Sequence, residues 1–93
     1  MQSDLNQYEL ALFSCIEIVL MRRGNANYNL VLAKLNALFD SKITDCYDHP
    51  EYLITVLRDV YKEDYESIIR EIRLEMGDLV VEEINDFIQI MLK

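Results

Sequence analysis

The chain of 93 residues is 52% hydrophobic and 28% charged, which predicts one globular domain over residues 1–93 and excludes a disordered chain or a second core. Two glycines and one proline are too few for the turns of an all-β fold. The net charge of −8, with −6 in residues 50–93, disfavours nucleic acid and anionic membranes as partners.

The beginning of the chain shows no targeting signal. The segment MQSDLNQYEL lacks the basic region of a signal peptide. The apolar run Leu10–Met21 is interrupted by Ser14 and Glu17 and is shorter than the roughly 20 residues of a membrane-spanning helix. The two cysteines, Cys15 and Cys46, form no disulfide framework. We therefore expect a cytoplasmic, reduced protein without a membrane partner.

The first predicted helix covers residues 4–23, with Ser3 as N-cap and Gly24 as its stop. At about 100° per residue, one face collects Leu5, Tyr8, Ala11, Leu12, Cys15, Ile16 and Val19. Other apolar residues fall opposite this face or between the two sides: Leu10, Phe13, Ile18, Leu20 and Met21.

A helix that is apolar nearly all round has two interpretations. It is either the central helix, wrapped by the others, or a helix that a partner covers. In the second case Leu10, Phe13, Ile18, Leu20 and Met21 form a candidate interface with a protein partner or with a second copy in a homodimer.

The second predicted helix runs from about Tyr28 to Phe39, with Asn27 as N-cap. Lys34 is its only charged residue before Asp40. Such a sparse outer face is a second indication of a contact surface. A loop over residues 40–47 follows, from which Ile43 is expected to return to the core.

The third predicted helix ends near Tyr61, and Asp48 and Glu51 are expected to form a capping box around Pro50 at its start. The fourth helix has the narrowest apolar seam: Tyr65, Ile68, Ile69, Ile72 and Met76. Gly77 ends it, and a fifth helix runs from Val80 or Glu82 to Leu92. These helical spacings of apolar residues predict an all-α fold, a compact single-domain bundle of about five helices.

The segment from Cys46 to Glu51 is the only place where metal or nucleophile chemistry could be considered. Cys46 and His49 offer two metal ligands, whereas a structural zinc site needs four. A Cys–His nucleophile pair would lack a Gly-rich loop or oxyanion donors. We therefore predict no catalytic residue, metal or cofactor, and interpret Cys46, Asp48, His49, Pro50 and Glu51 as a structural turn and helix cap.

A family resemblance rests on an ordered set of residues between about Leu12 and Leu92. Its members are Ile16, Gly24, Tyr28, Leu35, Cys46-Tyr47, His49-Pro50-Glu51-Tyr52-Leu53, Leu57, Val60-Tyr61, Tyr65 and Ile68-Ile69. In this order they resemble the small archaeal "Nitrosopumilus output domain" family of all-helical domains, found alone or attached to signalling modules. That family often has Gly after the aromatic that ends the third helix, where this chain has Lys62. The resemblance implies a regulatory or interaction role and transfers no catalytic residue.

These observations predict a protein-interaction or signalling-output module that self-associates and has no catalytic activity of its own. One alternative is a winged-helix-like transcription regulator, although its candidate recognition helices carry few arginines and lysines. The other is a helical domain that binds a small ligand, since several of the six tyrosines could line a pocket.

Overall fold

A computed structural model describes residues 6–93, and this part of the chain forms five α-helices and no strand. The α-helices are α1 (Gln7–Arg22), α2 (Asn25–Phe39), α3 (Pro50–Tyr61), α4 (Tyr65–Met76) and α5 (Glu82–Leu92). Three short 3-10 helices lie between them: η1 (Ile43–Tyr47), η2 (Lys62–Asp64) and η3 (Gly77–Leu79). The prediction of an all-α bundle of about five helices is confirmed.

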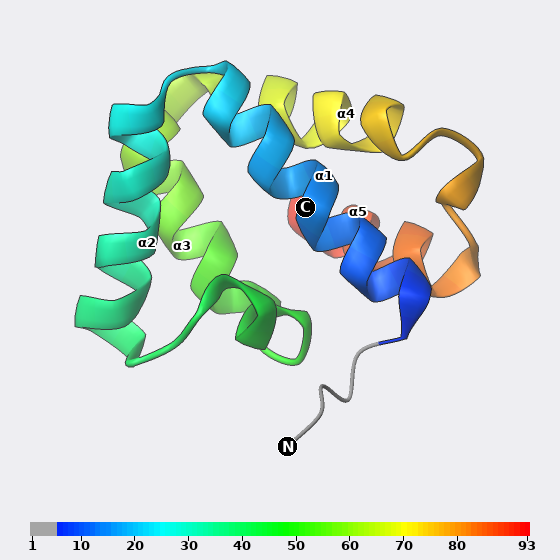
Figure 1. Ribbon diagram of the computed structural model, residues 1–93, viewed down its shortest axis with the longest axis horizontal. Coiled ribbons are helices and arrows are strands. Elements are labelled where there is room, and N and C mark those ends of the chain that lie inside the picture. The colour runs from blue at the N-terminus through cyan, green and yellow to red at the C-terminus, as the bar shows by residue number, and fades with distance from the viewer. Residues whose placement is uncertain (1–5) are drawn as a thin grey trace.

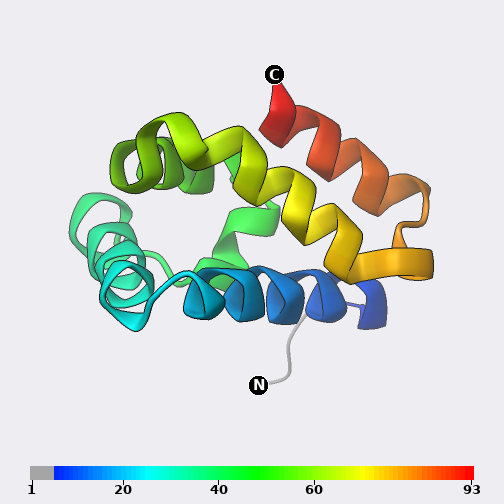
Figure 2. The same cartoon turned by 90° about the horizontal axis from the view of Figure 1, so that it is seen from above.

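Helix α1 lies nearest the viewer in Figure 1, with α2 and α3 on the left, α4 along the top and α5 behind. Seen from above, α1 and α5 lie on opposite sides of the molecule, with α4 crossing the upper face (Figure 2). Helix α1 packs against α2, α4, α5 and η1, while α2 packs mainly on α3. Helix α1 therefore contacts most of the other elements, but it is not wrapped on all sides, because its face with Leu10, Ile18 and Met21 is exposed.

All five helices and η1 contribute to a single hydrophobic core. The α4 seam from Tyr65 to Met76 is buried, and so is Ile43, as predicted. The accessible surface of 5630 Å² matches the roughly 5600 Å² expected for a compact monomer of 11.0 kDa. The chain therefore covers its core without help from a partner.

Helix α1 begins later than predicted. The proposed N-cap Ser3 lies outside the described residues, and the described cap is Asn6. The side chain of Asn6 accepts from the Glu9 N–H at 2.9 Å, and Glu9 Oε1 accepts from the Asn6 N–H at 3.2 Å. This reciprocal capping box satisfies two backbone donors that would otherwise have no helical partner.

Helix α2 begins earlier than predicted, and Asn27 is not its N-cap. Gly24 occupies the N-cap position with φ +125°, a conformation that residues with a Cβ rarely adopt. Because glycine permits this sharp turn, the next helix starts at Asn25, and the Tyr28 N–H already bonds to the Gly24 carbonyl at 3.2 Å.

The predicted capping box at Asp48 and Glu51 is also wrong. Asp48 has helical dihedrals at the end of η1, which itself falls inside the predicted loop. His49 is therefore the N-cap of α3, without a side-chain hydrogen bond, and Pro50 occupies the first turn as expected. The Tyr52 N–H closes this turn by bonding to the His49 carbonyl at 3.0 Å.

The joints that follow α3 and α4 have the same backbone conformation. Lys62 has φ +54° and ψ −123°, and Gly77 has φ +57° and ψ −126°. Each begins a single 3-10 turn. This positive φ favours glycine, so the backbone of Lys62 is strained whereas that of Gly77 is not.

Candidate functional site

The outer face of α1 carries three exposed apolar side chains. Leu10, Ile18 and Met21 are 46%, 42% and 42% exposed, with the small polar Ser14 between them. Because α1 packs its other sides against the rest of the molecule, this face is the part that the fold leaves uncovered. These three residues are therefore accessible, as the candidate interface requires.

The assignment of Phe13 and Leu20 to the candidate interface is wrong. Phe13 is only 3% exposed and packs edge-on against the rings of Tyr47 and Phe87. Leu20 is fully buried in the core. Helix α1 packs against α2, α4, α5 and η1, so these two residues between its faces belong to the core.

The outer face of α2 is also apolar or neutral. Leu30 and Leu38 are 43% and 59% exposed, and three alanines lie near them on the surface: Ala26, Ala33 and Ala37. The other exposed residues between 25 and 38 are asparagines. The exposed residues of this face therefore carry no charge.

Charged groups of α1 and α2 form pairs within the chain. The Glu17 carboxylate accepts from the Tyr28 hydroxyl at 2.9 Å, and Lys34 forms a 2.7 Å salt bridge with Asp59 of α3. These contacts direct the charged atoms of the two helices toward neighbouring elements. The outer faces of α1 and α2 therefore contain few charged atoms that a partner would have to desolvate.

Three ion pairs connect the C-terminal end of α1 to α4. The Arg22 guanidinium reaches Glu71 at 2.9 Å and Glu75 at 2.8 Å, while Arg23 reaches Glu71 at 3.0 Å. Side-chain hydrogen bonds from Glu75 and Glu71 raise the pKa of Arg22 above its usual value. This cluster holds the α1–α2 turn against the charged side of the molecule.

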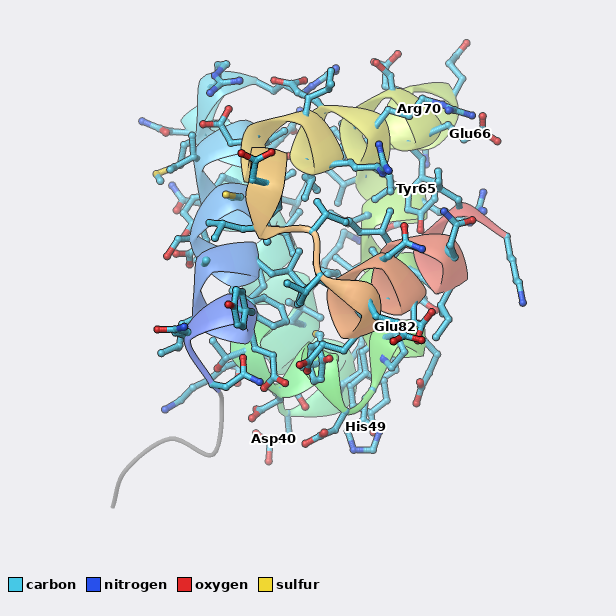
Figure 3. The ribbon with its side chains drawn as sticks, turned by 90° about the vertical axis from the view of Figure 1, so that its right-hand side faces the viewer. Asp40, His49, Tyr65, Glu66, Arg70 and Glu82 are labelled. Carbon is cyan, nitrogen blue, oxygen red and sulfur yellow. The ribbon has the colours of Figure 1, made fainter. Side chains whose placement is uncertain are left out.

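Charge is thus distributed very unevenly. Residues 6–40 contain three acidic and three basic residues and carry no net charge, whereas residues 50–93 carry −6. We use the name charge-poor surface for the exposed α1 and α2 residues Leu10, Ser14, Ile18, Met21, Ala26, Leu30, Ala33, Ala37 and Leu38. On α4 and α5, by contrast, charged side chains such as Glu66, Arg70 and Glu82 extend outward (Figure 3).

In the Cys46–Glu51 segment, Cys46 and His49 contact different groups. Cys46 is fully buried, and burial, with Asp45 and Glu51 nearby, raises its pKa to about 12, so the thiol stays protonated at neutral pH. The His49 imidazole is half exposed, stacks on Tyr52 and lies 3.4 Å from Glu51. Within residues 6–93 no group of three His, Cys, Asp or Glu side chains could hold a metal ion.

Two shallow grooves lie outside the charge-poor surface. One, of about 250 Å³, is formed by η1, the start of α3 and α5; its lining residues are Tyr47, Pro50, Glu83, Asp86, Phe87 and Ile90. We call it the α5 groove. The other, of about 210 Å³, is lined by Arg70, Arg73, Leu74 and Leu92. Both are smaller than typical pockets for small ligands, which span roughly 300–1,000 Å³.

The α5 groove was missed in the sequence. Its two walls lie almost forty positions apart in the chain, so no local sequence pattern connects them. The one available signal was the i, i+3, i+4, i+7 spacing of Glu83, Asp86, Phe87 and Ile90, which places them on one side of the fifth helix.

No protein-family model, curated protein or solved structure matches this chain. The resemblance to the output-domain family therefore remains a prediction. Among residues 6–93, none of the helices has both the length and the apolar character needed to cross a membrane.

Proposed function

We propose that this chain is a small protein-interaction module that self-associates through its charge-poor surface and serves as a signalling output or adaptor. One observation carries the proposal. The chain already covers its own core, yet five large apolar side chains remain on the outer faces of α1 and α2: Leu10, Ile18, Met21, Leu30 and Leu38. Apolar surface of this kind is typical of protein–protein contacts.

The charge distribution favours a second copy as the partner. Two molecules of net charge −8 repel each other in most orientations. The repulsion is weakest when the neutral α1–α2 sides meet and the charged α3–α5 sides point apart. A two-fold contact would place the same surface on both copies, as in most homodimers.

Neither alternative has a specific observation in its favour. Residues 6–93 contain no strand that could form the wing of a winged helix. The candidate recognition helix α2 has one basic residue, Lys34, which is engaged by Asp59. The grooves are open and small, so either groove would enclose a small ligand only weakly.

The test is the molar mass in solution, measured by light scattering after size exclusion at two widely separated concentrations. We expect a dimer for the unaltered chain and a monomer for Ile18→Lys or Leu30→Lys, because each would bury a charge in the interface. Leu74→Lys is the matched control, since Leu74 is 79% exposed on α4, outside the charge-poor surface.

Circular dichroism of each variant separates loss of association from loss of folding. A monomeric unaltered chain at both concentrations would refute self-association. Equal weakening by Leu74→Lys would refute the assignment to the charge-poor surface.

A further inference from the structure

The α5 groove has an apolar floor with carboxylates on its rim. The rings of Tyr47 and Phe87 stack with centroids 5.3 Å apart and an angle of 11° between their planes. Pro50 and Ile90 extend this apolar lining, and Ile90 is 43% exposed. Glu83 and Asp86, one helical turn of α5, supply the acidic side.

The negative charge at this end of the molecule is not neutralised within the described residues. Glu83 Oε2 accepts from the Tyr47 hydroxyl at 3.2 Å, and both Glu83 oxygens lie 3.4 Å from the Asn6 amide nitrogen. Among residues 6–93, no lysine or arginine forms an ion pair with Glu9, Glu83 or Asp86. The hydrogen-bond donors to Glu83 are thus neutral groups, and its other neighbour is the Glu9 carboxyl, so no cation of the described residues neutralises Glu83.

The Tyr47 hydroxyl and Glu9 both respond to this excess of carboxylates. Burial, together with Glu9, Glu83 and Asp48, raises the pKa of Tyr47 to about 12. Burial and Glu83 raise the pKa of Glu9 above its ordinary value. Burial is the larger cause of both shifts, and the nearby carboxylates act in the same direction.

We propose that the α5 groove binds a short basic and apolar segment of a protein partner. An arginine or lysine places its charged head between Glu83 and Asp86 and its methylene stem on the Tyr47–Phe87 floor. An adjacent apolar side chain of the same segment packs against Pro50 and Ile90. Complementary charge selects this occupant, since the whole molecule attracts cations.

Other occupants fit the groove less well. Nucleic acid and anionic lipid would meet the Glu83 and Asp86 carboxylates and a net charge of −8. A second copy would have to supply a basic segment, but Arg22 and Arg23 are held by Glu71 and Glu75. The groove is separate from the charge-poor surface, so this inference does not depend on self-association.

The probe is a short peptide that alternates arginine with leucine, compared with the same peptide carrying citrulline, which is neutral and nearly isosteric. Binding is followed by amide chemical shifts and by calorimetry. We expect shifts concentrated at Tyr47, Phe87 and Ile90, and an affinity at least several-fold weaker for the citrulline peptide. Equal affinity for the two peptides, shifts centred on another surface, or no binding would overturn the proposal.

Two matched pairs of variants locate the contact. Asp86→Asn should weaken binding about 1.4- to 5-fold, the range of a solvent-exposed ion pair, and more than Glu82→Gln does. Glu82 is the control because it is exposed in the same turn but does not line the groove. If Glu82→Gln weakens binding as much as Asp86→Asn, overall charge alone attracts the peptide and the site is refuted.

A second pair of variants tests the apolar part of the contact. Ile90→Ala should weaken binding about two- to fivefold through loss of apolar contact area. Leu79→Ala should leave it unchanged, since Leu79 is equally exposed, at 42%, but lies outside the groove. Equal effects of the two substitutions would show that the peptide does not lie along the groove.

Discussion

The α1–α2 hairpin and the α3–α5 half bury their shares of one core in different ways. Helices α3, α4 and α5 have one apolar side and, over most of the other, charged residues. Helices α1 and α2 carry five large exposed apolar side chains, against two, Leu74 and Ile90, on α3, α4 and α5. The core is complete without these outer residues. Folding alone therefore does not explain why the α1–α2 hairpin has so many exposed apolar residues.

The strongest way to test this difference uses two neighbours on α1. Leu20 is fully buried and Met21 is 42% exposed. We expect Leu20→Ala to lower the free energy of unfolding by about 2–5 kcal/mol, because it removes buried methyl groups and leaves a cavity. Met21→Ala should change it by less than about 0.5 kcal/mol.

Urea unfolding, at a protein concentration where the chain is monomeric, measures both effects. Similar losses for the two variants would place Met21 in the core and remove the contrast between the inner and outer faces of α1.

Lys62 and Gly77, which follow α3 and α4, provide a second test of the comparison between the two parts of the molecule. Gly77→Ala should lower the free energy of unfolding by about 1–2 kcal/mol, because it puts a Cβ on a residue at φ +57°. That Cβ would meet no atom within 4 Å, so the loss is conformational. Lys62→Gly, in the same conformation, should raise it by about 1 kcal/mol.

Thermal or urea unfolding of the two variants decides this prediction by the sign of the change. Stabilisation by Gly77→Ala, or destabilisation by Lys62→Gly, would show that backbone strain does not govern the joints of α3 and α4.

A smaller effect is expected from two tyrosines on either side of the first joint. The buried Tyr65 hydroxyl donates to the Met91 carbonyl at 2.6 Å, linking α4 to α5. The Tyr61 hydroxyl is buried and finds no hydrogen-bond partner among the described residues. Tyr65→Phe should therefore lower the free energy of unfolding by about 1 kcal/mol, whereas Tyr61→Phe should leave it unchanged or raise it slightly.

Each of the two substitutions removes one hydroxyl and keeps the ring, so each serves as the control for the other in the same unfolding experiment. A larger loss for Tyr61→Phe than for Tyr65→Phe would contradict the hydrogen bonding described for the charged half.

The helix pattern could be predicted best where a helix has one apolar side. The α4 seam is correct residue by residue, and Gly77 ends this helix. On α1, the angular position of Phe13 and Leu20 did not reveal how many neighbours surround the helix, because that number depends on contacts with distant segments. Local turn chemistry was the other source of error: Asn6 with Glu9, rather than Ser3, forms the described cap.

The two candidate surfaces also differ in how far the sequence could predict them. Exposure of Leu10, Ile18 and Met21 could be inferred from one helix alone, since all three lie opposite its main apolar face. The α5 groove could not, because Tyr47 and Phe87 meet only after α5 has packed back against η1 and α3. Sequence patterns within single helices do not reveal which distant elements pack against each other.

The uneven charge also bears on how large an assembly could become. In a dimer joined through the charge-poor surface, each copy would turn its α3–α5 half outward and present a shell of net charge −6 to further molecules. The neutral contact area would be used up on both copies at once. The same feature that permits the first encounter would then terminate growth, giving a closed and soluble pair in place of a filament.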